Sequence, residues 1–259
     1  MLERLRQVAF LVKDLEEGKE LYRRHLGMET CHSEDLSNYG LLNAVLPAGA
    51  GTFIELLQPT SDDSAAARYL ERRGEAPYML IFETSEYDRL IPFLKSMGVR
   101  LSEGTATGDY RHYFVHPSSA NGALLEIIEV TDGENPWPPA GPDWQTLEHQ
   151  PLTKQIRQMA VLVRDLDEAL VNWEKMFGIK STKRFQVSFT DLEIAVLPLG
   201  GKDTFIELAQ PSAGDVPSAR FLERYGEGIY LTIYEIEDSL AMDDYLKGQD
   251  ARYTSSRVT

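Results

Sequence analysis

The sequence repeats itself, and this repetition constrains the fold more than any other feature of the chain. The segment LRQVAFLVKDLEEG at residues 5–18 recurs as IRQMAVLVRDLDEA at residues 156–169. The segment TFIELLQP at 52–59 recurs as TFIELAQP at 204–211, so equivalent residues lie 151 or 152 positions apart. A spacing that is constant within one residue over this distance indicates a duplicated domain.

The first copy contains a weaker repeat of its own. The stretch at 45–59 resembles the stretch at 114–130, because each has an apolar run, a Pro, a turn of small residues and a strand with an internal Glu. A helix should begin at Asp14 and end at Gly27, and the same signals recur 151 residues later. We therefore expect an α+β fold, in which tandem copies of paired βαβββ modules form curved mixed sheets around a cavity.

The expected organisation is a first domain over 1–130, made of two βαβββ units, a linker over 131–154 and a second copy of this domain over 155–259. The linker holds five of the chain's 13 prolines and shows little periodicity. Thr259 is equivalent to residue 107 of the first copy, so the second copy lacks the strands YFVHP and ALLEIIE. By the repeat, we expect the natural polypeptide to run on for about 20–30 residues, or another chain to supply the strand.

Composition excludes several classes of function. The chain has 26 Lys and Arg against 41 Asp and Glu, a formal net charge of −15, which repels the phosphates of nucleic acids. No apolar run approaches the length of a membrane span. Cys31 is the only cysteine, so no intramolecular disulfide can form, which fits a reducing cytoplasm. We expect a cytoplasmic protein with a small-molecule substrate, without nucleic-acid or membrane partners. It would be a monomer through pairing of its two copies, or a homodimer.

Four segments carry a resemblance to a known family: RQVAFLVKDLEEGKELYRRHLGM, FIELLQP, ARYLERRGEAPYMLIFE and FVHPSSANGALLEIIE. They resemble the vicinal oxygen chelate superfamily, which includes glyoxalase I, extradiol dioxygenases, bleomycin-resistance proteins and methylmalonyl-CoA epimerase. The order of FIELLQP, a Leu-Glu-Arg helix, Gly-Glu and a strand most resembles the epimerase. The resemblance covers about residues 4–130 and again 155–257. It implies the fold more strongly than a reaction, because this fold hosts many chemistries.

The resemblance also implies a metal site. The oxygen ligands that it implies are two glutamines and three glutamates: Gln7, Glu55 and Glu126 in the first copy, Gln158 and Glu207 in the second. Where relatives carry a metal-binding His, this chain has Met79 and Leu231, and no His lies after residue 149. An all-oxygen set suits Mg²⁺, Mn²⁺ or Ca²⁺ better than Zn²⁺. The alternatives are that no metal binds and that these glutamates are ordinary outward-facing strand positions.

Glu193 lies on the strand before the Gly turn of the second copy, where the resemblance implies a catalytic Glu, whereas the first copy has Asn43 there. A Glu near a second Glu in a dry cavity has a raised pKa and can act as a general base. His112 is expected on a solvated face.

Two functions follow from these residues. The first is a metal-dependent epimerase, isomerase or lyase. We favour it, without deciding from the sequence that the chain is an enzyme. It would act on a small carboxylic or acyl-thioester substrate through the Glu193 base. The second is a metal-free small-molecule binding protein of the resistance type. An extradiol dioxygenase is disfavoured, because its iron site needs two histidines and the second half has none.

Overall fold

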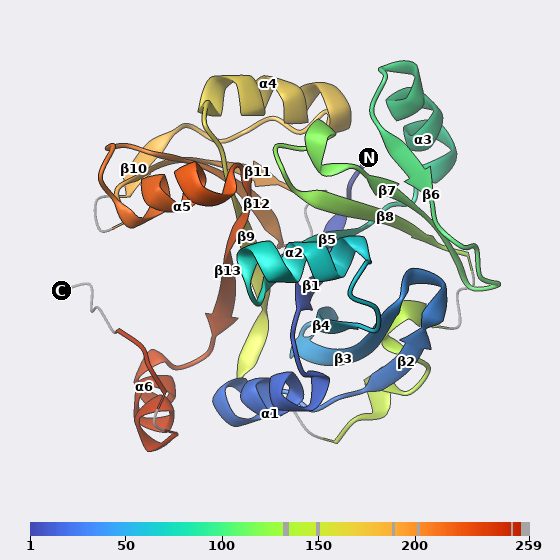
Figure 1. The fold of residues 1–259 in the computed structure, drawn as a ribbon, viewed down its shortest axis with the longest axis vertical. Coiled ribbons are helices and arrows are strands. Elements are labelled where there is room, and N and C mark those ends of the chain that lie inside the picture. The colour runs from blue at the N-terminus through green and yellow to red at the C-terminus, as the bar shows by residue number, and fades with distance from the viewer. Residues whose placement is uncertain (132–134, 149–150, 188–189, 201–202, 250, 255–259) are drawn as a thin grey trace.

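The structure is a computed structural model, and it describes residues 1–131, 135–148, 151–187, 190–200, 203–249 and 251–254. Two curved mixed sheets, one for each copy of the repeat, lie next to each other with the helices packed around them (Figure 1). None of the helices in the described part of the chain is long and apolar enough to cross a membrane.

The first sheet has eight strands in the order β2-β3-β4-β1-β5-β8-β7-β6. β1 (Arg4–Leu11) pairs in parallel with β4 (Thr52–Pro59), and β5 (Ala76–Glu83) pairs in parallel with β8 (Leu124–Val130). β1 and β5 run antiparallel and join the two halves. The other strands are β2 (His32–Leu36), β3 (Leu41–Gly49), β6 (Leu101–Glu103) and β7 (Tyr110–Val115). This sheet is therefore the pair of βαβββ units that the repeat predicts.

The second sheet has five strands in the order β10-β11-β12-β9-β13. They are β9 (Thr153–Leu162), β10 (Phe185–Val187), β11 (Leu192–Pro198), β12 (Phe205–Pro211) and β13 (Gly228–Ile236). This order repeats β2-β3-β4-β1-β5 of the first sheet, so the two FIEL segments occupy equivalent strands. Residues 255–259, where the expected continuation of the chain begins, lie outside the described residues.

Local signals set the helix ends. α1 (Leu15–Leu26) begins after Asp14, whose carboxylate accepts the backbone N–H of Glu17 at 2.9 Å, and it ends at Gly27 with φ 64°. α4 (Leu166–Phe177) repeats both caps in the second copy. The remaining helices are α2 (Ala65–Arg73), α3 (Tyr87–Ser96), α5 (Pro217–Tyr225) and α6 (Ser239–Gly248). Short 3-10 turns are η1 (Ser37–Tyr39), η2 (Pro117–Ser119), η3 (Pro138–Ala140) and η4 (Trp144–Thr146).

The two copies contact each other through equivalent residues. The backbone N–H of Leu5 donates to the hydroxyl of Thr204 at 3.0 Å, and that of Ile156 donates to the hydroxyl of Thr52 at 2.9 Å. Both threonines are fully buried. Leu5 is the repeat equivalent of Ile156, as Thr52 is of Thr204, so the contact is reciprocal. The copies thus pair within one chain about a local two-fold axis.

Side-chain alternation along the strands positions the site. On β4, Ile54 and Leu56 belong to the large core, whereas Phe53 and Leu57 belong to a second apolar cluster on the concave face. Glu55 shares the face of Phe53 and Leu57, because side chains two apart on a strand point the same way. The concave face of the first sheet therefore combines apolar walls with an acidic group.

Candidate functional site

The concave face of the first sheet encloses a cavity of about 650 Å³, termed the cup. Neighbouring strands line it with polar side chains, each largely buried: Asn43 of β3, Glu55 of β4, Gln7 of β1, Glu126 of β8 and His112 of β7. The three residues that the sequence predicts to converge here, Gln7, Glu55 and Glu126, line this one cavity. Met79 of β5 also lines it, at the position where the resemblance implies a His.

Glu55 is held by two amides. Gln7 Nε2 donates to Glu55 Oε2 at 3.0 Å, and Asn43 Nδ2 donates to Glu55 Oε1 at 2.9 Å. The side chain is 6% exposed, and this burial raises the pKa of Glu55 to about 7, opposed by the Asn43 hydrogen bond and assisted by the charge of Glu126. At neutral pH the carboxyl is therefore shared between its protonated and ionised forms.

The linker supplies Trp137, which contacts the cup residue Gln7 and which the sequence did not predict. Its indole is fully buried, and Nε1 donates to Gln7 Oε1 at 2.9 Å. The guanidinium of Arg6 lies 4.7 Å from the ring centre, and Asn135 Oδ1 accepts the Trp137 backbone N–H at 3.0 Å. A Trp among prolines was the available signal, because a large ring is seldom left in water. The indole fixes Gln7 so that its amide group points at Glu55.

His112 and Glu126 form a second buried pair, which corrects the expectation that His112 lies on a solvated face. His112 Nδ1 contacts Glu126 Oε1, and His112 Nε2 lies 3.1 Å from the backbone carbonyl of Thr105. A carbonyl only accepts, so Nε2 carries a proton. Burial lowers the pKa of His112, but the hydrogen bond and charge of Glu126 outweigh it and the net shift is upward. This arrangement favours the protonated form of His112 beside Glu126.

The sequence profile of the Glyoxalase/Bleomycin resistance protein/Dioxygenase superfamily matches residues 6–115 and 157–259. The chain belongs to this superfamily. The mitochondrial methylmalonyl-CoA epimerase of Bos taurus is 31% identical over 133 residues, which span 50% of this chain and 75% of that protein. The ethylmalonyl-CoA/methylmalonyl-CoA epimerase of Cereibacter sphaeroides is 30% identical over 135 residues, 50% of this chain and 100% of that protein.

The similarity to a solved structure also extends over nearly the whole chain. A mutant of 4-hydroxymandelate synthase from Streptomyces coelicolor superposes with a TM-score of 0.75 over 96% of this chain and 75% of its own, at 16% identity. That similarity concerns the fold alone, and it includes the arrangement of the two copies.

Members of the superfamily typically bind a divalent metal ion. In this chain the expected ligands are already engaged, because Gln7 Oε1 accepts from Trp137 and both oxygens of Glu55 accept from amides. Met79 offers only a thioether, a poor ligand for Mg²⁺, Mn²⁺ or Ca²⁺. Among the described residues, no group of three or more His, Cys, Asp and Glu could hold a metal ion. As folded, the cup therefore does not fit a divalent ion. A metal site at Gln7, Glu55 and Glu126 would need these hydrogen bonds to break, and it stays a prediction.

The second copy repeats part of the site. Gln158 Nε2 donates to the carboxylate of Glu207, which is buried as Glu55 is. Burial raises the pKa of Glu207 to about 7, against the hydrogen bond from Gln158. Leu231, at the position of the absent His, is 38% exposed. The described part of this sheet ends at β13, so none of its residues is equivalent to Glu126. The second copy therefore presents half of the constellation.

The structure does not place Glu193 beside Glu207, as the sequence predicts. In the pairing of β11 with β12, Glu193 lies opposite Gln210, and Val196 lies opposite Glu207. Opposed residues share a face and neighbours alternate, so Glu193 and Glu207 project from opposite faces of the sheet. The Glu193 side chain is 42% exposed, with Arg184 at 3.8 Å. The expected pair of carboxyls is therefore wrong.

The physical reason is that Glu193 is the equivalent of Leu42, not of Asn43, because the two sheets share one register. Asn43 lies opposite Leu57 in the first sheet, and Ile194 lies opposite Ala209 in the second. Ile194, not Glu193, is thus the equivalent of Asn43, and neighbouring residues of a strand face opposite ways.

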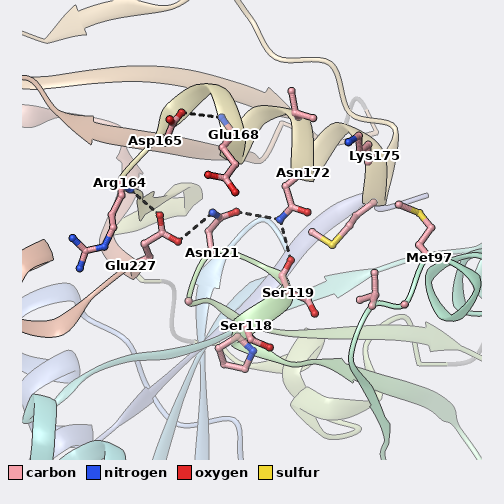
Figure 2. A pocket seen from close by; sticks show the side chains of 16 residues that line it. Met97, Ser118, Ser119, Asn121, Arg164, Asp165, Glu168, Asn172, Lys175 and Glu227 are labelled. Atoms are coloured by element: carbon pink, nitrogen blue, oxygen red, sulfur yellow. Dashed lines mark hydrogen bonds between the residues drawn. The ribbon is translucent and has the colours of Figure 1, made fainter.

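A second hollow, of about 810 Å³, lies between the copies (Figure 2). Asn172 of α4 donates to the backbone carbonyl of Ser119 at 3.0 Å and to Asn121 Oδ1 at 3.3 Å. Asn121 Nδ2 donates to Glu227 Oε2 at 3.2 Å, and the backbone N–H of Arg164 donates to Glu227 Oε1 at 2.7 Å. Asn172 and Glu227 of the second copy thus form hydrogen bonds with Ser119 and Asn121 of the first. The polar groups of this hollow therefore hold the two copies together.

Proposed function

We propose that the cup of the first copy moves a proton beside the carbonyl of a small acyl compound, as an epimerase or isomerase does. The observation that carries the proposal is a pair of buried carboxyls in contrasting surroundings within one cavity. Glu126 contacts the imidazole of His112, whereas Glu55 has only neutral amide partners and a pKa raised to about 7. Two carboxyls whose surroundings differ in this way are suited to act as a base and an acid.

Each group has a defined part in the reaction. The Glu126 carboxylate removes the proton from the carbon next to the carbonyl, and the electrons of that C–H bond move into the enolate. Strands β1 and β5 separate Glu55 from Glu126 along the sheet. Protonated Glu55 returns a proton to the same carbon from the opposite face of the substrate, and the enolate electrons re-form a C–H bond. The carbon is inverted, and exchange with water restores both carboxyls. Gln7 and Asn43 orient Glu55, and His112 is a positioning residue for Glu126.

The names of the relatives support one class of substrate. Two are named as epimerases of methylmalonyl-CoA, and about half of this chain matches each of them. This supports an acyl thioester, or a small carboxylic compound, as the substrate. Proton removal at the same carbon is also the first step of many lyase reactions.

The test follows the proton. The protein is incubated with methylmalonyl-CoA and with neutral acyl thioesters in D₂O, and loss of the proton next to the carbonyl is measured by NMR. We expect Glu126→Gln and Glu55→Gln each to lower the exchange rate by about a hundredfold or more, the contribution typical of a positioned acid or base. The matched control, Glu237→Gln, changes a carboxylate whose side chain is 84% exposed and should leave the rate unchanged. Exchange at the buffer rate with every thioester, or full activity in both cup variants, would refute the proposal.

A metal-dependent form of the proposal places Mg²⁺, Mn²⁺ or Ca²⁺ on Gln7, Glu55 and Glu126. It requires Gln7 to give up its hydrogen bond from Trp137. Titration calorimetry with Mn²⁺ tests it. If the ion binds at these residues, the heat of Mn²⁺ binding seen with the wild type should disappear in Glu55→Gln. The equivalent prediction for Gln158 and Glu207 is tested by Glu207→Gln, and a Glu193 base is tested by Glu193→Gln in the exchange assay.

The second candidate function is metal-free binding of a small molecule without reaction. It is favoured by a specific observation: Gln7, Glu55 and His112 already have protein partners, as in a preformed binding site. A ligand that binds the cup stoichiometrically, with no proton exchange in any thioester, would select this function over the first.

A further inference from the structure

We infer that the cup takes a ligand bearing an organic cation, an amine or quaternary ammonium group attached to an apolar body. The inference rests on the proposed function only in placing the ligand in the cup, and it concerns binding whether or not a proton is moved. It follows from the charge of the lining, from the rings that make one wall and from where the nearby arginines point.

The ionisable groups of the lining are mostly acidic. None of the described residues that line the cup is a Lys or an Arg. Five lining residues carry carboxyl groups: Glu34, Glu55, Glu103, Asp109 and Glu126. The two lining imidazoles are already engaged, because His112 contacts Glu126, and His32 lies 3.7 Å from the carboxylate of Glu34. The described lining thus offers a ligand no cationic side chain that is not already beside a carboxylate.

Basic residues are present on the same strands but face elsewhere. Arg111 precedes His112 on β7, so its side chain leaves the sheet on the other face. There it forms ion pairs with Glu129 at 2.6 Å and Asp88 at 2.8 Å. Arg6 stacks on Trp137 and is not among the residues lining the cup. Strand alternation therefore keeps Arg111 away from the cavity, and Arg6 is held against Phe53 and Trp137 outside its lining.

One wall of the cup is made of rings, termed the aromatic wall: Tyr39, Tyr110 and Phe114, with the imidazole of His112 between them. Phe114 packs edge-on against Tyr39 at 6.1 Å and against His112 at 5.2 Å, and Tyr110 packs against His112 at 5.5 Å. Faces of aromatic rings attract ammonium groups, most strongly where water is excluded. Aromatic rings combined with carboxylates recognise an organic cation in a way that neither does alone.

The negative charges act on this same wall. Burial raises the pKa of Tyr110, and the charges of Glu126, Glu55 and Glu34 add to the rise. Glu126, Glu55 and Glu34 therefore lie close enough to this ring to act on it when they are ionised. Glu103 and Asp109, both exposed, extend the negative potential to the mouth, where it would draw cations inward. A volume of about 650 Å³ suits a ligand of drug size.

The test uses three probes with the same body and different charge: 3-phenylpropylamine, 3-phenylpropanol and 3-phenylpropanoate. Titration calorimetry on the full chain measures each affinity at neutral pH. We expect the amine to bind about tenfold more tightly than the alcohol, and the carboxylate to bind most weakly. Added salt should reduce the advantage of the amine, because part of it is electrostatic. Equal affinities, a tighter carboxylate, or no binding of any probe at millimolar concentration would overturn the inference.

Variants connect the preference to the cup. Tyr110→Leu should remove most of the advantage of the amine over the alcohol, whereas Tyr110→Phe, which keeps the ring, should retain it. Asp109→Asn, at an exposed position that does not threaten folding, should lower amine affinity alone. Tyr253→Leu, outside the cup, is the matched control. Amine binding without proton exchange would refute only the proposed reaction, and exchange without a preference for the amine would refute only the inference made here.

Discussion

Replacing Glu55 with Gln should change how the stability of the protein depends on pH. The pKa of Glu55 rises from its ordinary 4.5 to about 7 because the folded chain buries the carboxyl. Below pH 4.5 the group is neutral in both the folded and the unfolded chain. As the pH rises from 4.5 to about 7, the unfolded chain ionises while the folded chain keeps its proton, so stability is lost across this window. Above it the loss is constant.

The magnitude follows from the two pKa values. A difference of one pKa unit corresponds to about 1.4 kcal/mol, so the wild-type protein should lose about 2.5 kcal/mol through Glu55 between about pH 5 and about pH 8. Gln cannot ionise and escapes this loss. It carries a cost of its own, because its NH₂ group must face an amide donor of Gln7 or Asn43. That cost is the same at both pH values and cancels in the comparison.

The assay is urea unfolding of the wild type and Glu55→Gln at the two pH values. The free energy of unfolding of the variant, relative to wild type, should rise by about 2.5 kcal/mol from the lower to the higher pH. Glu207, the other carboxyl with a pKa raised to about 7, is present in both proteins and cancels. Glu237→Gln, at an exposed site, should follow the wild type. Parallel pH profiles for wild type and Glu55→Gln would show that Glu55 is not held protonated by burial.

Three further outcomes are expected. Trp137→Phe keeps the apolar volume but leaves Gln7 Oε1 without its donor, so the free energy of unfolding should fall by about 1–3 kcal/mol in urea titrations; an unchanged value would contradict the contact. Thr52→Val and Thr204→Val should each lower the free energy of unfolding by about 1–3 kcal/mol. If the two reciprocal contacts act independently, the double variant should lose the sum of the two single losses. Dialysis against EDTA should leave the melting temperature unchanged, since the cup as folded does not fit a divalent ion; a drop restored by Mn²⁺ would support the metal-dependent form.

The repeat determined most of the fold. Two segments of similar sequence adopt the same order of strands, so FIELLQP and FIELAQP had to occupy equivalent strands, β4 and β12. Helix ends were equally local, because an Asp cap and a Gly in a left-handed conformation act on backbone groups within the same turn. The convergence of Gln7, Glu55 and Glu126 in one cavity followed from the family resemblance, not from the repeat.

The partners of those residues were decided only by the tertiary structure. The hydrogen bond from Trp137 to Gln7 joins residues 130 positions apart, and no local pattern in a Pro-rich linker specifies such a contact. The burial of His112 against Glu126 depends on the pairing of β7 with β8 and on the curvature of the whole sheet. Glu193 failed as a prediction for a different reason: its equivalent in the first copy is Leu42, not Asn43, and neighbouring residues of a strand face opposite ways. Sequence periodicity specifies which residues can share a face, whereas the charge, protonation and hydrogen-bond partners of a buried group depend on which distant side chains the fold brings against it.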